Sequence, residues 1–127
     1  MQNIHRYFLY LAILFLFFLS YDAWLGFWFT NAAGEVEFGV GVGSLVLLAN
    51  IVLLGGYTLG CHSLRHLIGG RKDLLAGSPA QLQSYRCVSC LNRNHMRWAW
   101  TSLFWVGFTD VYVRLCSMGI WSDWRLF

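Results

Sequence analysis

The sequence predicts an all-α membrane protein, a bundle of three transmembrane helices whose N-terminus is cytoplasmic. The first observation is composition: 57% of the 127 residues are hydrophobic, 18% are aromatic and only 12% are charged. About a quarter of the residues in a typical soluble domain are charged. The second observation is that three stretches reach the roughly 20 mostly apolar residues that a helix needs to cross a bilayer. We therefore expect one membrane-anchor domain over 1–127.

The first predicted span covers about 7–29 and is interrupted only by Asp22. A cleaved signal peptide is the alternative for an apolar stretch near the N-terminus. Its apolar core is usually only about 7–15 residues long and is followed by a cleavage site with small residues. This stretch is longer and no such site follows closely, so we interpret it as a membrane helix.

The second predicted span covers about 38–68 and is rich in glycine. Gly39 and Gly43 form one pair four residues apart, and Gly56 and Gly60 form another. Small residues at this spacing let a second helix approach closely. They would equally let a flat macrocycle approach, and the sequence leaves both interpretations open.

The third predicted span covers about 96–121 and contains two charged residues, Asp110 and Arg114. They are four residues apart, so they can neutralise each other on one helix face and lower the cost of membrane insertion. A structural ion pair is the first interpretation. The alternative is an outer polar cluster on a proton path or at the propionates of a second haem.

The orientation follows from the basic residues, which concentrate in cytoplasmic segments of membrane proteins. Seven of the nine lie before the first span, at the end of the second, in the loop at 70–95 or at the start of the third span: Arg6, Arg65, Arg71, Lys72, Arg86, Arg93 and Arg97. The loop at 30–37 has two glutamates and no basic residue, and the C-terminal tail has only Arg125. This asymmetry predicts a cytoplasmic loop at 70–95 and an external C-terminus.

All four histidines fall at the predicted cytoplasmic level: His5, His62, His66 and His95. Imidazole binds both haem iron and zinc, and four histidines at one depth of a small bundle suggest a shared site. The alternative is that they are interfacial residues that meet lipid headgroups.

His62 and His66 lie one helical turn apart and project in the same direction. They cannot be the two axial ligands of one haem, which approach the iron from opposite sides. One of them is therefore a candidate axial ligand, with the second histidine from another helix or a partner chain. We favour His62 as the iron ligand. Arg65, His66, His95 and His5 are candidates for contact with a haem propionate or a quinone, and arginine suits a carboxylate especially well.

The cysteines offer a different metal site. Cys87, Cys90 and His95 form C-x2-C-x4-H in the predicted cytoplasmic loop, and Cys61 is adjacent to His62. C-x2-C supplies half of a zinc or iron–sulfur site. The alternative is that Cys87 and Cys90 are reduced thiols that pack against a partner subunit. Neither a nucleophile–base pair nor a phosphate loop is evident, and we expect no nucleic-acid partner.

The segment SLRHLIGGRKD (63–73) resembles the membrane-anchor subunits of succinate dehydrogenase and fumarate reductase. Their haem-bearing helix commonly carries H-x3-G-x-R-H-L-x2-D near its inner end. Arg65, His66 and Leu67 match the R-H-L core, and Ser63 takes the position of the glycine. The upstream histidine of the motif would fall at Leu59 and the aspartate at Gly70, whereas this chain has His62 and Asp73.

The resemblance implies a multi-pass subunit in the bacterial inner membrane. It would bind haem b, dock the iron–sulfur subunit of a succinate:quinone oxidoreductase and help transfer electrons to a quinone, with menaquinone expected. The flavoprotein subunit would carry out succinate chemistry, and other membrane-anchor chains and the lipid bilayer are further partners. Whether the isolated chain is an enzyme stays open; in the complex it would be a subunit of succinate dehydrogenase that does not bind succinate. The alternatives are a non-catalytic scaffold or assembly subunit of another respiratory complex, or a separate membrane enzyme that uses Cys87, Cys90 and His95.

Overall fold

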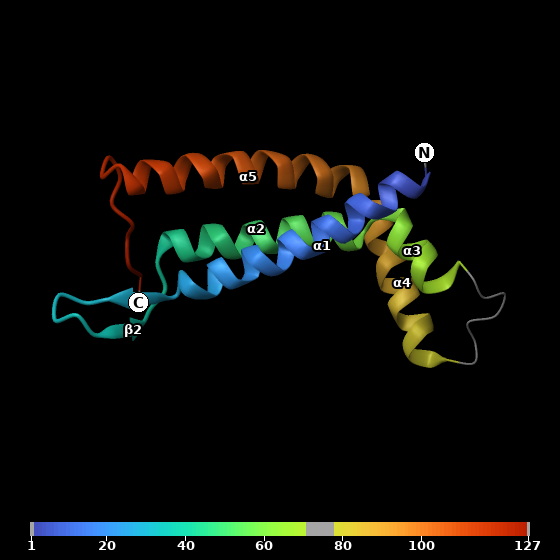
Figure 1. Ribbon diagram of the computed structural model, residues 1–127, viewed down its shortest axis with the longest axis horizontal. Helices are drawn as coiled ribbons and strands as arrows, with labels where there is room; N and C mark the ends of the chain where they lie inside the picture. The colour runs from blue at the N-terminus through green and yellow to red at the C-terminus, as the bar shows by residue number, and fades with distance from the viewer. Residues whose placement is uncertain (1, 71–77, 127) are drawn as a thin grey trace.

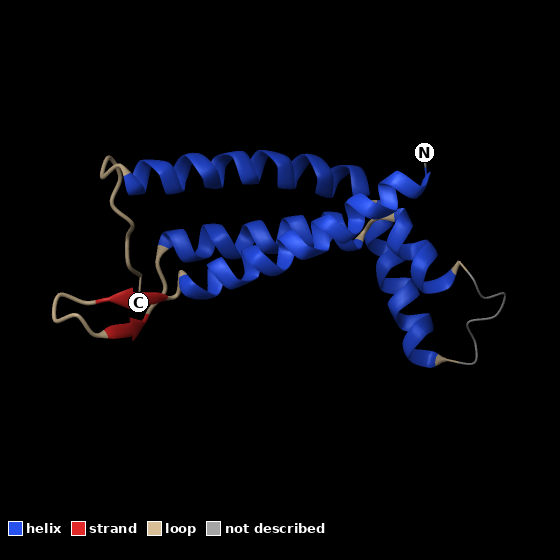
Figure 2. Ribbon diagram, in the orientation of Figure 1, coloured by secondary structure: helices blue, strands red, loops and turns tan. Residues whose placement is uncertain are grey.

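The computed structural model describes residues 2–70 and 78–126, which are mostly helical (Figures 1 and 2). The described helices are α1 (Gln2–Leu25), α2 (Val42–Leu59), α3 (His62–Gly69), α4 (Pro79–Arg93) and α5 (His95–Ser117). The strands β1 (Trp28–Thr30) and β2 (Val36–Phe38) form an antiparallel hairpin between α1 and α2. Arg71, Lys72 and Asp73 from the sequence analysis lie outside the described residues.

The three long helices α1, α2 and α5 run along the length of the molecule, and α2 packs against both of the others (Figure 1). The short helices α3 and α4 pack together at one end, beside the N-terminus, and the hairpin lies at the other end with the C-terminus. We call these the α3/α4 end and the hairpin end. Among the described helices, Ile4–Leu25 and Val42–Leu59 are long and apolar enough to cross a membrane.

The interior of the bundle consists largely of small and polar residues. The buried residues of α2 are Ser44, Val46, Asn50, Gly55, Gly56 and Thr58. In contrast, α1 exposes many large apolar side chains, such as Tyr7, Phe17 and Trp24. In water this much exposed apolar surface would drive association. Membrane helices instead pack through small residues and present large apolar side chains to lipid, so the distribution fits a protein that resides in a bilayer.

The predicted span at 38–68 is divided in the structure, because α2 ends at Leu59 and α3 begins at His62. At Gly60 the chain passes close to α4: an added Cβ would lie 3.2 Å from the Cβ of Leu91 and 2.7 Å from the carbonyl oxygen of Gly56. Asn92 donates a hydrogen bond from its side-chain amide to the Gly60 carbonyl at 2.8 Å. This contact compensates for a helical hydrogen bond that the break removes.

At the hairpin end, the C-terminal tail folds back onto the start of α2. Asp123 accepts hydrogen bonds from the backbone N–H of Gly43 at 2.8 Å and from the Tyr112 hydroxyl at 2.9 Å. Arg125 forms an ion pair with Glu37 of β2 at 3.2 Å. The tail therefore links α2, α5 and the hairpin. The sequence analysis did not predict the hairpin, whose three-residue strands are too short to show an alternating pattern.

Candidate functional site

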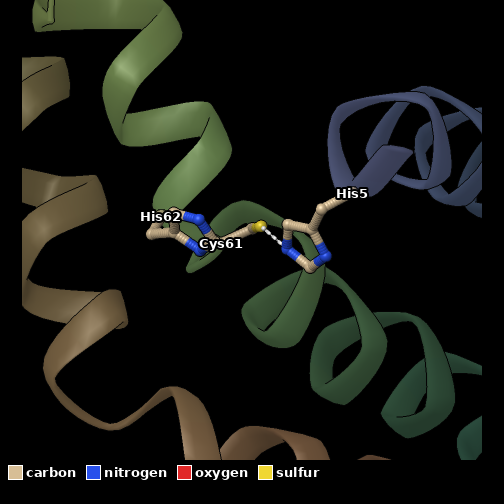
Figure 3. Close-up of side chains that lie close together, drawn as sticks. All are labelled: His5, Cys61 and His62. Carbon is tan, nitrogen blue, oxygen red and sulfur yellow. Dashed lines mark hydrogen bonds between the residues drawn. The ribbon is translucent and has the colours of Figure 1, made fainter. Parts of the chain in front are cut away.

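His5, Cys61 and His62 converge at the α3/α4 end (Figure 3). His5 lies in the first turn of α1, Cys61 precedes α3, and His62 is the first residue of α3. Their potential ligand atoms all lie within 4.8 Å of one another. His5 Nε2 is 3.1 Å from Cys61 Sγ, and the rings of His5 and His62 stack at 4.9 Å with an angle of 12° between their planes.

The break between α2 and α3 produces this convergence. In one continuous helix, adjacent residues point about 100° apart, because each turn contains 3.6 residues. Here Cys61 has an extended backbone, with φ −66° and ψ 137°. Its side chain is 5% exposed and faces α1, whereas His62 is exposed and His5 is half-buried. The cluster therefore has a buried thiol on one side and an accessible imidazole on the other.

His95 belongs to the same neighbourhood. Its ring stacks on Tyr57 at a centroid distance of 4.8 Å, and its buried Nδ1 atom has no hydrogen-bond partner among the described residues. Burial lowers the pKa of His95, and the nearby His5 and His62 lower it further. The lowered pKa of His95 favours the neutral imidazole, which is the form that binds metals. The structure therefore brings His5, His62 and His95 together, which are three of the four histidines that the sequence analysis places at one level.

Arg65 and His66 have different surroundings. Arg65 Nε donates a hydrogen bond to the Tyr85 hydroxyl at 3.1 Å, and the guanidinium lies 5.1 Å from the centre of the Tyr85 ring. Arg65 therefore joins α3 to α4. His66 lines a small cavity of about 120 Å³ together with Arg6, His62 and Ser63.

Cys87 and Cys90 are exposed on α4. Among the described residues, the group of close metal-ligand candidates contains Cys61 and neither of these two cysteines. The sequence analysis noted that Cys61 is adjacent to His62 but did not include it in a ligand set. The missing signal was the contact with His5, which lies 56 residues earlier in the chain.

Asp110 and Arg114 form an ion pair on α5, with Arg114 Nε 3.1 Å from Asp110 Oδ2. Both side chains point away from the bundle, because they are 61% and 74% exposed, respectively. The pair is therefore on the outer surface of α5 and does not contact the histidines at the α3/α4 end.

Comparisons with known proteins identify the family. Residues 1–119 match the family model described as actinobacterial succinate dehydrogenase subunit SdhC. The chain belongs to this family. It is also similar to a chain of the Mycobacterium smegmatis Sdh1 complex in the apo form, with 41% sequence identity and a TM-score of 0.86. That match covers 99% of this chain and 46% of the other, so the chain spans about half the length of its relative. No curated protein matches significantly.

Membership in the SdhC family confirms the resemblance drawn from Arg65, His66 and Leu67. The chain is a succinate dehydrogenase membrane subunit, with two described helices that can span a bilayer. In this SdhC chain, the side chain of Arg65 in the R-H-L core contacts Tyr85, and its backbone N–H donates a hydrogen bond to the Cys61 carbonyl at 3.2 Å.

The contact between Arg65 and Tyr85 can be tested with a double-mutant cycle. We expect Arg65→Gln and Tyr85→Phe each to destabilise the purified complex by about 1 kcal/mol, because each removes the same hydrogen bond. The double variant should then be no less stable than the weaker single variant, as measured by thermal unfolding. Arg86→Gln, an exposed position on the same helix, is the control. Additive losses would mean that the two side chains act independently.

Proposed function

We propose that this chain is the membrane anchor of a succinate:quinone oxidoreductase, that it docks the iron–sulfur subunit at its α3/α4 end, and that it helps electrons reach a quinone. Menaquinone is the expected quinone, and succinate chemistry belongs to the flavoprotein subunit. The observation that carries the proposal is the cluster of His5, Cys61 and His62 in a chain of the SdhC family. The cluster lies at the end of the bundle where the described basic residues concentrate.

We also propose that α5 is a third membrane crossing, in the bacterial cell membrane, with the α3/α4 end on the cytoplasmic side. Its 23 residues correspond to about 34 Å of helix, and the hydrocarbon core is about 30 Å thick. It packs along α2 from the α3/α4 end to the hairpin end (Figure 1). The positive-inside rule supports the orientation, since Arg6, Arg86 and Arg93 all lie near the α3/α4 end.

Haem b needs axial ligands on opposite sides of its iron and a cavity that holds the macrocycle. The ring nitrogens of His5 and His62 have lone pairs in the ring planes, and these planes are nearly parallel and stacked. Two such rings cannot approach one iron from opposite sides. The cavity beside His62 and His66 measures about 120 Å³, whereas sites for medium-sized ligands measure about 300–1,000 Å³. A haem between His5 and His62 therefore does not fit, and the haem b prediction requires a ligand from a partner chain.

A small metal centre fits these residues better. A thiolate with imidazoles is a ligand set of zinc sites. An iron–sulfur cluster in which histidines replace two cysteines would need a second thiolate beside Cys61. Ligands around one tetrahedral metal lie roughly 3.5 Å apart, so binding would require the stacked rings of His5 and His62 to turn toward a common point. We propose that His5, Cys61 and His62 hold the centre and that His95, with its unpartnered Nδ1, is the candidate fourth ligand. Zinc does not change its oxidation state, so a role in electron transfer requires iron.

The deciding experiment combines metal analysis, an absorption spectrum and activity of the complex purified from membranes. We expect iron in excess of the other subunits' content, lost in Cys61→Ser and retained in Cys87→Ser. Quinone reduction should fall at least about a hundredfold in Cys61→Ser. Removing a group that only supports a metal ligand already costs about 10–100-fold in metal affinity or activity, and Cys61 would itself be a ligand. Succinate oxidation with a soluble acceptor should persist, because it takes place on other subunits.

Three outcomes would contradict this proposal. A b-type absorption band of the reduced complex that disappears in His66→Ala would show that the chain binds haem b. Zinc lost in Cys61→Ser would indicate a structural metal. Normal quinone reduction in all variants would indicate that the chain has a scaffold or assembly role and takes no part in electron transfer.

The exposed ion pair on α5 supports contact with another membrane segment. Charged side chains are costly at membrane depth and almost always face protein or water. Asp110 and Arg114 nevertheless point away from α1 and α2. We propose that further helices cover this face of α5. They would belong to another anchor chain or correspond to the part of the larger relative that this chain does not match.

Substitutions in this pair test whether the face is covered. Asp110→Asn leaves Arg114 with an uncompensated charge, so we expect less assembled complex in the membrane. The double variant Asp110→Asn/Arg114→Gln should recover much of the loss, because it removes both charges. The measurement is the amount of intact complex after extraction, compared between the two variants. Equal amounts for wild type and Asp110→Asn would indicate that the pair meets water.

A further inference from the structure

A cavity of about 280 Å³ opens between α2 and α5 near the α3/α4 end, apart from the His5–Cys61 contact. It is lined by Leu53, Asn94, Arg97, Trp98 and Thr101. We propose that this cavity binds an anionic phospholipid, with the phosphate at Arg97 and Asn94 and the beginning of an acyl chain along Leu53 and Trp98. The inference rests on the shape, depth and charge of the cavity and is independent of the proposed metal centre.

The floor of the cavity is formed by a close contact between α2 and α5. Gly56 has no side chain, and Trp98 occupies the space: an added Cβ at Gly56 would lie 2.6 Å from Cε3 of the indole. Trp98 thus lies directly against the backbone of α2, beside Leu53 one turn away. The two side chains provide an apolar wall that follows the direction of the helices, as an acyl chain does.

Asn94 and Arg97 lie at the outer edge of the cavity, and Thr101 lies four residues further along α5. Asn94 precedes α5 and Arg97 lies in its first turn, whereas Leu53 is six residues inside the end of α2 at Leu59. Six helical residues correspond to about 9 Å of depth. From the end of the helices inward, the cavity passes from the charged Arg97 to the apolar Leu53. A lipid passes in the same order from its phosphate to its acyl chains. Trp98 and Trp100 at this level fit the aromatic belt of a membrane interface.

The charge of the cavity selects an anion. Arg97 is exposed, Arg93 is the last residue of α4, and neither forms an ion pair with a described carboxylate. The carboxylates of the described residues belong to the other half of the molecule, at Asp22, Glu35, Glu37, Asp110 and Asp123. An arginine guanidinium binds a phosphate with two parallel hydrogen bonds. A neutral quinone would leave this charge without a partner, so an anionic lipid is the better match.

Native mass spectrometry of the delipidated complex tests the assignment. The probes are phosphatidylglycerol, phosphatidylcholine and inorganic phosphate, and the readout is the number of bound molecules at each concentration. We expect one phosphatidylglycerol to bind more tightly than phosphatidylcholine. Arg97→Gln should weaken it about tenfold, which is the cost of one charge-assisted hydrogen bond. Arg86→Gln, an exposed arginine of α4 outside the cavity, should bind as wild type does.

Trp98→Ala separates the lipid from a free anion, because it removes the apolar wall and keeps Arg97. It should weaken phosphatidylglycerol and leave the affinity for inorganic phosphate unchanged. Equal binding of phosphatidylglycerol by wild type and Arg97→Gln would overturn the proposal. Equal affinity for phosphatidylglycerol and phosphatidylcholine, or competition by inorganic phosphate at equal concentration, would do so as well. Thermal unfolding of each variant complex checks that it remains folded.

Discussion

The rest of the structure depends on the break between α2 and α3. Gly60 allows the chain to pass close to α4, and the side chain of Asn92 supplies a hydrogen bond to its carbonyl. Because the helix stops there, Cys61 faces His5 of α1 and His62 begins a helix with a new direction. The same change of direction places α3 against α4, where Arg65 meets Tyr85. One interrupted helix therefore joins the membrane bundle, the metal-ligand candidates and the proposed docking surface.

The bilayer explains why the bundle is organised in this way. The described interior is rich in glycine, serine and threonine, which permit close packing, and most of the large apolar side chains face outward. Each end then carries a polar structure of its own. The hairpin end is closed by Asp123 and by the ion pair between Arg125 and Glu37. The α3/α4 end carries the four histidines and, within the described part of the chain, arginines that form no ion pair, which suit a partner subunit and an anionic membrane surface.

The sequence predicted the features that depend on composition and local order. The apolar stretches identified the membrane helices α1 and α2, the R-H-L core identified the family, and the common depth of the histidines anticipated that His5, His62 and His95 lie together. Features that depend on contacts between distant residues were not predicted. Cys61 became a ligand candidate only through His5, 56 residues away, and Arg65 was assigned to a propionate or quinone before its contact with Tyr85 was known. The break at Gly60 was hidden because glycine also suits close helix packing.

The central claim is that Cys61 and the neighbouring imidazoles bind one metal centre. X-ray absorption spectroscopy at the iron edge of the purified complex, recorded for wild type and Cys61→Ser, tests it most directly. The iron–sulfur subunit contributes sulfur-ligated iron to both samples, so the test rests on the difference between the two spectra. We predict that this difference contains iron bound to both sulfur and nitrogen. Identical spectra, or a difference that shows nitrogen ligands alone, would contradict the claim.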